Sequence, residues 1–358
     1  MIITSTGFFN TGSSAITGML QEFSKIESSG DVNEIRLLYD SDCIGDLEYN
    51  LIDTPHRHNT SNAVKRFKKF VDFNTNPLLN HHYEEIFNNK FKTLSYDYIN
   101  KICDTIYPGF YYGDSYNRGK FYWFLNRCYQ KVLRTFFYNK KITKYFTPDL
   151  FSKKELCYGG TYSEEKFLKE TKNYVSSLLN EYNKKKTEYI LIDQFLPPTN
   201  IDRYLRYIPD DQKTKVFVVE RDPRDLYFTA KYFTRSGVVP TDNVNTFCDW
   251  YLWTRGQASK KAKSKDVMYV QFEDLIYNYD GMRKKICKFV GIDIKSDCAQ
   301  KTHFDPAKSV NNTQVWKRFK NINKDELKTI EKKLAEYCYS FPTDGIQPDF
   351  SKLNMFDC

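Results

Sequence analysis

The residue types that bind phosphate groups occur in two stretches of this sequence. The first is Gly7-Phe8-Phe9-Asn10-Thr11-Gly12-Ser13-Ser14, which follows a short apolar run. Its two glycines allow positive φ values and a close approach of the backbone to an anion. We expect Ser13 and Ser14 to cap a following helix, whose first free N–H groups would then face that anion. This stretch predicts a strand, a phosphate-binding loop and a helix.

The spacing of this loop fits G-x-x-x-x-G-K-[ST], except that Ser13 replaces the lysine. In ATP and GTP hydrolases that lysine reaches the β- and γ-phosphates, so a plain nucleoside triphosphatase is disfavoured. The loop therefore favours another phosphate ligand. Taken alone, it is equally compatible with an ordinary glycine-rich turn.

The second stretch is Arg221-Asp222-Pro223-Arg224-Asp225, directly after the apolar run that ends at Glu220. Asp222 suits the N-cap of a helix, Pro223 suits the first helical position, and Asp225 would complete the capping arrangement. Thr229 lies two helical turns beyond the cap, on the same face. Arg221 and the Thr229 hydroxyl together predict a clamp on a phosphate group.

These stretches need a sheet to position them, and five runs have the composition of strands. They begin near residues 2, 35, 190, 217 and 268. The continuous apolar run at Lys215 to Glu220 is typical of a parallel sheet. We predict an α/β fold: a three-layer, P-loop-like parallel sheet with a large helical insertion.

Two carboxylates come at the ends of these expected strands and are candidate general bases. Asp42 follows the run Glu34 to Tyr39, and Asp193 ends the run that starts at Tyr189. In open parallel sheets the ligand crevice lies at the carboxyl ends of the strands. A solvated acidic turn is the alternative for each.

Helical periodicity dominates from residue 56 to residue 186. We therefore divide the chain into a nucleotide-binding core of residues 1–55 and 187–320, a helical insertion of residues 56–186 that is an expected acceptor-binding cap, and a C-terminal helix and tail of residues 321–358. The insertion holds the basic residues His56, Arg57 and His58. Its aromatic residues either stack on sugar rings or fill a core, namely Tyr107, Phe110, Tyr111, Tyr112, Tyr116, Phe121, Tyr122 and Trp123.

The chain has 358 residues and a formal net charge of +9, which suits an anionic ligand. The sequence lacks zinc-finger spacing and an RNP-like aromatic signature, so we expect no dedicated nucleic-acid binding. No apolar run approaches the roughly 20 residues of a membrane span. With a strand expected from Ile2, no secretory signal is predicted, and we expect the cytoplasm.

In its motifs the chain resembles the sulfotransferases that use 3′-phosphoadenosine 5′-phosphosulfate (PAPS), of the bacterial carbohydrate type. The stretch from Arg221 to Thr229 is similar to that family's R-x-P-R-D-x-x-x-[ST] motif for the 3′-phosphate. Residues 7–14 resemble its 5′-phosphosulfate loop. Residues 267–275 and 282–292 resemble its strand ending in YEDL and the following helix that closes on F-L-G. Residues 312–317 stand in the place of its G-x-W-K segment, although the glycine is missing.

This resemblance implies PAPS as the donor, a carbohydrate or glycan as the acceptor, and no metal. It implies that Arg221 and Thr229 bind the 3′-phosphate. The other residues implied at the donor are Asn10, Thr11, Gly12, Ser13, Ser14, Trp316 and Lys317.

The chain departs from the family pattern at two points. Asn10 stands where the family has Lys or Arg, so another cation is needed, and Arg57, His56 and Lys317 are the candidates. The usual catalytic His or Glu has no clear counterpart, which leaves Asp193 and Asp42 as candidate bases. Two alternatives remain open: a P-loop kinase-like phosphotransferase that depends on ATP and magnesium, and a non-catalytic nucleotide-binding protein.

Overall fold

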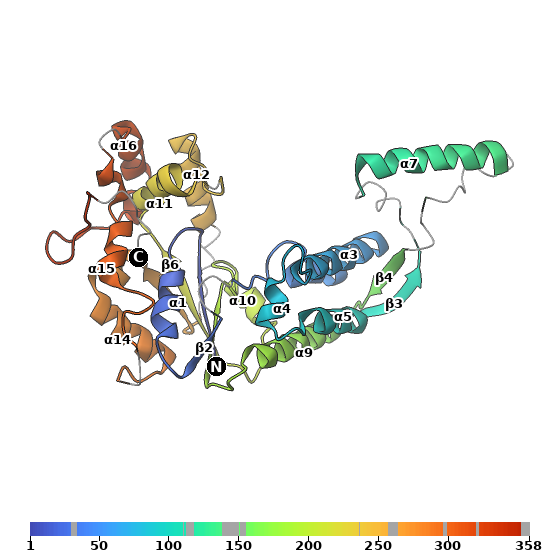
Figure 1. Cartoon of the computed structure of the whole chain (residues 1–358), viewed down its shortest axis with the longest axis horizontal. Helices are drawn as coiled ribbons and strands as arrows, with labels where there is room; N and C mark the ends of the chain where they lie inside the picture. Colours follow the sequence, from blue (N-terminus) through green and yellow to red (C-terminus); the bar gives the residue numbers. More distant parts are fainter. Residues whose placement is uncertain are drawn as a thin grey trace. The chain divides into compact units, whose positions relative to one another are not determined.

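The computed structural model divides the chain into two compact units (Figure 1). The first consists of Met1–Leu38 and Leu179–Cys358, and the second of Tyr39–Leu178. The structure describes residues 1–29, 34–109, 111, 118–137, 150, 155–235, 237–256, 264–295, 299–319 and 322–351. In these residues no helix has the length and apolar character needed to cross a membrane.

The first unit is built on a five-stranded parallel sheet with the strand order β2-β5-β1-β6-β7. Strand β1 lies between β5 and β6, in a register that pairs Ser5 with Asp193 and with Phe217. The carboxyl ends of these strands therefore meet at one edge of the sheet. The strands are β1 (Ile2–Gly7), β2 (Ile26–Ser28), β5 (Tyr189–Asp193), β6 (Thr214–Glu220) and β7 (Val267–Gln271).

Four of the five predicted strands are present, and the prediction of a strand at Glu34 to Tyr39 is wrong. These residues form an extended stretch and a turn. Ile35 donates one backbone hydrogen bond to the Asp193 carbonyl at 3.0 Å, but no strand ladder follows. The run has the apolar composition of a strand, but its leucines, Leu37 and Leu38, are buried in a turn instead. The edge strand is instead β2, which pairs with β5.

The helices of this unit pack around two clusters of buried side chains, one of which includes residues of the sheet. One cluster joins β1, β6 and β7 to α1, α13 and α14, and includes Ile3, Ile16 and Leu275. The other includes Leu226, Phe247 and Ile330, from α11, α12 and α16. The expected α/β fold with a parallel sheet is confirmed. The helices of this unit are α1 (Ser14–Gln21), α10 (Ile201–Leu205), α11 (Pro223–Thr229), α12 (Val244–Gly256), α13 (Phe272–Tyr277), α14 (Tyr279–Val290), α15 (Pro306–Ser309) and α16 (Lys324–Lys333).

The second unit is mainly helical, as its periodicity predicts. Its core includes Tyr98 and Tyr174, whose rings stack with centroids 4.6 Å apart. The described helices that lie in or enter this unit are α2 (Ile44–Glu48), α3 (Arg57–Asn74), α4 (His82–Ile86), α5 (Phe91–Ile102), α7 (Gly119–Val132) and α9 (Glu164–Tyr182).

This unit also contains a strand pair that the sequence did not predict. The helical periodicity of residues 56–186 predicts no strand here, but α5 ends at Ile102 and β3 (Cys103–Pro108) follows at once. It pairs antiparallel with β4 (Leu156–Gly160). Helical periodicity masked the β-branched and aromatic residues of β3, which favour a strand when a partner strand is available.

Candidate functional site

The loop after β1 has a strained backbone. Phe9 and Asn10 have φ values of 72° and 52°, and Gly12 has a φ of 86°. Two successive non-glycine residues in the left-handed region are costly and persist only where surrounding contacts hold them. One such contact is the hydrogen bond from Arg221 Nη1 to the Asn10 carbonyl, at 3.0 Å. A strained loop held by a buried arginine is typical of a binding site.

The glycines of the loop are needed for space as well as for conformation. A Cβ atom at Gly7 would lie 2.0 Å from Thr11 Oγ1, and a Cβ atom at Gly12 would lie 2.5 Å from the ring of Phe272. Neither position accepts a side chain without movement of its neighbours. The sequence singled out both glycines for this close approach.

Helix α1 begins at Ser14, with Ser13 as its N-cap residue, but the Ser13 side chain makes no capping bond. The expectation that both serines cap the helix is wrong. The Ser13 hydroxyl instead accepts a hydrogen bond from Gln194 Nε2 at 2.9 Å. Gln194 also accepts from Thr6 Oγ1 at 3.1 Å and has a positive φ of 57°. It thereby ties the end of β5 to the loop, a role that only the folded chain reveals.

The guanidinium group of Arg221 connects three segments at the carboxyl end of β6. Nη1 reaches the loop at Asn10, and Nη2 donates to Thr229 Oγ1 at 3.3 Å and to the Asn312 carbonyl at 2.6 Å. The side chain is 6% exposed. The predicted convergence of the loop and Arg221, and the predicted proximity of Arg221 to Thr229, are confirmed. The part played by Asn312 was not predicted.

The start of α11 follows the sequence closely. The Asp222 carboxylate accepts from the Arg224 N–H at 2.8 Å, and Pro223 is the first helical residue. Asp225 does not complete the cap, contrary to expectation. Its carboxylate accepts from the N–H groups of Gln314 and Val315, at 3.0 and 2.7 Å. The N–H of Asp222 is satisfied by Glu273 Oε1 at 3.0 Å.

Three buried carboxylates therefore lie behind Arg221: Asp222, Asp225 and Glu273. Burial, followed by the charge of Asp222, raises the pKa of Glu273 to about 7. The same two causes raise the pKa of Asp225 well above its ordinary value. The positive charge of Arg221 lowers the pKa of both carboxyl groups and so partly offsets these shifts. Arg221 therefore stabilises the ionised carboxylates of this cluster.

This cluster predicts that the free energy of unfolding falls as the pH rises from about 4.5 through about 7. In that range the Glu273 carboxyl keeps its proton in the folded protein but loses it in the unfolded chain, so folding is favoured at the lower pH. The expected fall is on the order of 3 kcal/mol, since one pKa unit corresponds to about 1.4 kcal/mol. Urea unfolding across this range measures it.

The comparison variant is Glu273→Gln, which cannot ionise and can still accept from the Asp222 N–H. We expect its stability to depend less steeply on pH than that of the natural protein, with Asp225 supplying the remaining slope. Identical slopes for the two proteins would rule out Glu273 as the source.

Four buried polar atoms at this site have no hydrogen-bond partner among the described residues. They are Asn10 Nδ2, Thr11 Oγ1, Arg221 Nε and Asn312 Oδ1. Buried polar groups in folded proteins are normally paired, so a cluster of partnerless ones indicates a missing ligand or water. Three of the four are donors, which suits the acceptor oxygens of a phosphate group. The residues present therefore fit a phosphorylated ligand.

The segment expected over the nucleotide lies mostly inside the unit. Trp316 is buried, with the Arg224 guanidinium 4.4 Å from its ring centroid. Lys317 is exposed and donates to Gln314 Oε1. Because Trp316 packs against α11, its burial needs no bound ligand. Contact of Trp316 or Lys317 with the donor stays a prediction.

The two candidate bases lie in different units. Asp193 ends β5, as predicted, but it is 2% exposed and accepts from Ser5 Oγ at 2.8 Å. Asp42 does not follow a strand, contrary to expectation. It lies in a turn of the second unit, with a φ of 63°, and pairs with Arg66 Nε at 2.7 Å.

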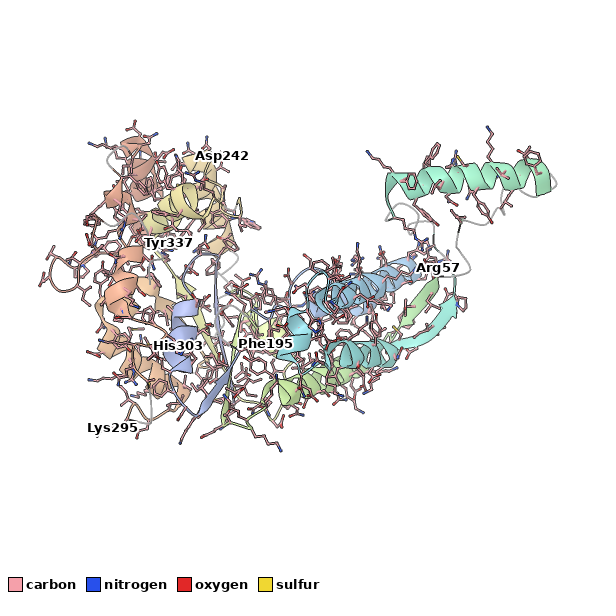
Figure 2. The ribbon with its side chains drawn as sticks, in the orientation of Figure 1. Arg57, Phe195, Asp242, Lys295, His303 and Tyr337 are labelled. Carbon is pink, nitrogen blue, oxygen red and sulfur yellow. The ribbon has the colours of Figure 1, made fainter. Side chains whose placement is uncertain are left out.

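Arg57 is the first residue of α3, in the second unit (Figure 2). The preceding residue, His56, is the N-cap, and its ring accepts a hydrogen bond from the His58 N–H at 3.4 Å. The Arg57 guanidinium lies 6.0 Å from the centroid of the Tyr111 ring. Arg57 is thus presented at a helix start beside an aromatic ring.

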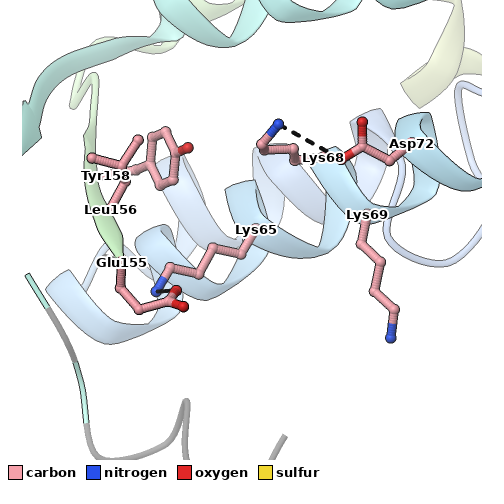
Figure 3. A pocket seen from close by; sticks show the side chains of 7 residues that line it. All are labelled: Lys65, Lys68, Lys69, Asp72, Glu155, Leu156 and Tyr158. Atoms are coloured by element: carbon pink, nitrogen blue, oxygen red, sulfur yellow. Dashed lines mark ion pairs between the residues drawn. The ribbon is translucent and has the colours of Figure 1, made fainter. Parts of the chain in front are cut away.

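The second unit also has a cavity of about 340 Å³ between α3 and β4 (Figure 3). Two ion pairs line it, Lys65 with Glu155 at 3.7 Å and Lys68 with Asp72 at 3.6 Å. Figure 3 shows that Lys69 extends away from these pairs. The remaining lining residues are Leu156 and Tyr158. Lys65 and Lys68, from the basic run of α3, line this cavity while half-buried, and Lys69 is exposed.

The chain was compared with protein families, with curated proteins and with solved structures. Residues 203–336 match the model of the sulfotransferase domain family. This range includes Arg221, Thr229, Glu273 and Trp316, and it excludes the loop of residues 7–14. A search of curated proteins gives no match.

Solved structures similar to this chain include two mycobacterial sulfotransferases. STF1 from Mycobacterium tuberculosis H37Rv is 13% identical over 93% of this chain and 76% of its own, with a TM-score of 0.36. STF9 from Mycobacterium avium is 14% identical over 96% and 78%, with a TM-score of 0.35. A retinol dehydratase in complex with androsterone and the inactive cofactor PAP is 16% identical over 46% and 60%, with a TM-score of 0.26.

Proposed function

We propose that this chain, whose residues 203–336 match the model of the sulfotransferase domain family, transfers a sulfuryl group from PAPS to a hydroxyl of a carbohydrate or glycan. The observation that carries the proposal is the cluster of partnerless donors formed by Asn10, Thr11 and Arg221. They lie where the loop after β1 meets the end of β6. A donor nucleotide with two separate phosphate positions would satisfy such a cluster.

In the proposed complex, Arg221 and Thr229 hold the 3′-phosphate, and residues 10–14 hold the 5′-phosphosulfate. Both Nη atoms of Arg221 already bind protein oxygens, which fixes the guanidinium plane and leaves Nε for the ligand. PAPS supplies an activated sulfuryl group. Its S–O bond to the 5′-phosphate breaks as a new S–O bond forms to the acceptor hydroxyl, with PAP as the other product.

The protein must stabilise the negative charge that develops on the 5′-phosphate oxygen, and Asn10 carries no charge. Arg221 is committed to Asn10, Thr229 and Asn312 through its Nη atoms. We therefore propose Arg57, at the exposed start of α3, as the compensating cation.

A base must accept the proton of the acceptor hydroxyl. Asp193 is nearly inaccessible and is held by Ser5, which suits a positioning role. The Asp42 side chain is 45% exposed. We propose Asp42 as the base, with Arg66 holding its carboxylate in place.

The proposed acceptor, a carbohydrate, rests on the cavity between α3 and β4. Ligand sites commonly combine a few fixed polar groups with an apolar or aromatic wall in a volume of about 300–1,000 Å³. The two ion pairs supply fixed donors and acceptors, and Leu156 and Tyr158 supply the wall. Paired charges favour a neutral, hydroxyl-rich ligand over an ion.

Transfer of label from PAPS to a panel of glycans tests this function. We expect the natural protein to label at least one glycan, and Arg57→Ala to lower the rate by about 10²-fold or more, the cost typical of losing one charge-stabilising group. Lys284→Ala, an exposed change on α14, is the matched control and should be neutral. Asn10→Lys supplies the missing cation directly, although Asn10 has a φ of 52°, which lysine adopts less readily.

Two results would contradict the proposal. If the natural protein binds PAP and labels no acceptor, and only the Asn10→Lys variant hydrolyses PAPS, the natural protein is a non-catalytic nucleotide-binding protein. If it transfers phosphate from ATP in the presence of magnesium and ignores PAPS, it is a kinase-like phosphotransferase.

A further inference from the structure

Helix α7 is attached to the second unit by one face. The Asn126 side chain accepts a hydrogen bond from the Leu150 N–H at 2.7 Å, and the Tyr122 hydroxyl donates to the Leu150 carbonyl. Just before the helix, Arg118 pairs with Glu155, with its guanidinium 4.7 Å from the Tyr122 ring centroid. These contacts determine which side of α7 faces the protein and which sides face outward.

One outward side is apolar. Phe121 is 76% exposed, Phe124 61% and Leu125 39%. Together with Cys128 and Val132 they follow the spacing i, i+3, i+4, i+7, i+11, which places them on one stripe of a helix. Aromatic residues of this region were expected to fill a core or to stack on sugars. The exposure of Phe121 and Trp123 contradicts the core, and Phe110, Tyr112 and Tyr116 lie outside the described residues.

Beside the apolar stripe runs a basic one. Lys120, Arg127 and Lys131 share the spacing i, i+7, i+11 and are all exposed. Residues 118–137 contain five Lys or Arg residues and no Asp or Glu. Trp123 lies next to this stripe, with the Arg127 guanidinium 5.1 Å from its ring centroid.

We propose that α7 docks this protein on an anionic lipid surface, with the apolar stripe among the acyl chains and the basic stripe on the headgroups. An amphipathic helix with Lys and Arg on one side and Trp, Phe and Leu on the other lies in the plane of the membrane interface. The 14 residues of α7 are fewer than the roughly 20 that cross a bilayer. Charge complementarity selects the occupant, because the charged residues of the segment 118–137 are all basic, although one of them, Arg118, pairs with an acidic residue outside it, Glu155.

Two other occupants fit less well. A nucleic acid would use the basic stripe but would leave the aliphatic side chains Leu125 and Val132 in water. A second copy of this chain would bring one positive stripe towards another. The proposal does not depend on the sulfuryl transfer proposed above, because α7 contributes none of the residues placed at the donor.

Co-sedimentation of the full chain with lipid vesicles tests the proposal. We expect binding to vesicles of phosphatidylcholine mixed with phosphatidylglycerol, and much weaker binding to pure phosphatidylcholine or in high salt. Each basic residue near such a surface contributes roughly a fivefold gain in affinity, so the triple change Lys120→Glu, Arg127→Glu, Lys131→Glu should reduce binding roughly a hundredfold or more. The matched control replaces Lys284, Lys285 and Lys288, which are exposed on α14, by glutamate. This variant should bind the vesicles as the natural protein does.

The apolar stripe is tested by Phe121→Ser, Phe124→Ser and Leu125→Ser together, which keeps every charge and should also abolish binding. Circular dichroism confirms that each variant folds. Quenching by brominated lipid of a tryptophan placed in the apolar stripe, as Phe124→Trp combined with Trp123→Phe, tests whether α7 lies at the acyl boundary. Equal binding by the α7 and α14 charge variants would overturn the proposal, as would vesicle binding that survives the serine changes. The proposal would also be overturned if the changes in α7 abolished dimerisation or RNA binding but left vesicle binding intact.

Discussion

Replacing Arg221 by alanine is expected to weaken the binding of PAP about ten- to a hundredfold, and to weaken the binding of adenosine 5′-monophosphate by a smaller factor, through the loop that Arg221 holds at Asn10. Arg221 brings a buried charge to the loop, to Thr229 and to Asn312, and its Nε atom has no partner among the described residues. A charge-assisted hydrogen bond of this kind is worth about 1.5–3 kcal/mol. Because only PAP has a 3′-phosphate, the preference for PAP should disappear. Titration calorimetry with both nucleotides measures it.

The matched controls separate ligand binding from folding. Thr229→Ser keeps the hydroxyl beside Arg221 and should retain the preference, whereas Thr229→Ala should lose part of it. Because the removal of Arg221 leaves Asp225 and Glu273 buried without their cation, the variant should also unfold at lower urea concentration. Equal affinity of the natural protein for PAP and adenosine 5′-monophosphate would refute the 3′-phosphate assignment.

Replacing Gly12 by alanine is expected to destabilise the protein by roughly 2–4 kcal/mol and to remove donor binding. Gly12 has a φ of 86°, and a Cβ atom there would lie 2.5 Å from the Phe272 ring. The left-handed conformation costs about 1–2 kcal/mol for a residue with a Cβ, and overpacking in a core costs about 1–3 kcal/mol. Urea unfolding and PAP titration measure the two effects.

Gly256→Ala is the control, because Gly256 ends α12 with open space around its Cβ position. We expect it to be neutral or slightly stabilising. The double variant Gly12→Ala with Phe272→Leu should recover part of the lost stability, since it relieves the overlap but leaves the backbone conformation unfavourable. A fully stable Gly12→Ala variant that binds PAP normally would show that the loop adopts another conformation in solution.

Short-range patterns in the sequence determined much of the core. The runs of β1, β5 and β6 form strands that are buried on both faces, as expected for the central strands of a parallel sheet, whereas β7, at the edge, is mostly half-buried. Asp222 and Pro223 begin α11 because a cap and a first-turn proline act within a few residues. The glycines of the loop were also readable, because a need for positive φ or close approach leaves few other choices.

Only the tertiary structure decided how residues distant in sequence satisfy one another. Asp225 has the spacing of a capping residue, yet its carboxylate accepts from the N–H groups of residues 314 and 315. The Asp222 N–H that it would cap donates to Glu273 instead. Asp193 ends a strand as predicted, but its burial beside Ser5 depends on strand order, which periodicity does not encode.

The same limit applies to the aromatic residues of the second unit. The apolar side chains of α7 have the spacing of a helix that buries one stripe, so the sequence suggested a core. The contacts of Tyr122 and Asn126 with Leu150 turn a different side inward. Periodicity shows that a helix has an apolar face, because it depends on residues three or four apart. What covers that face depends on partners that local sequence does not specify.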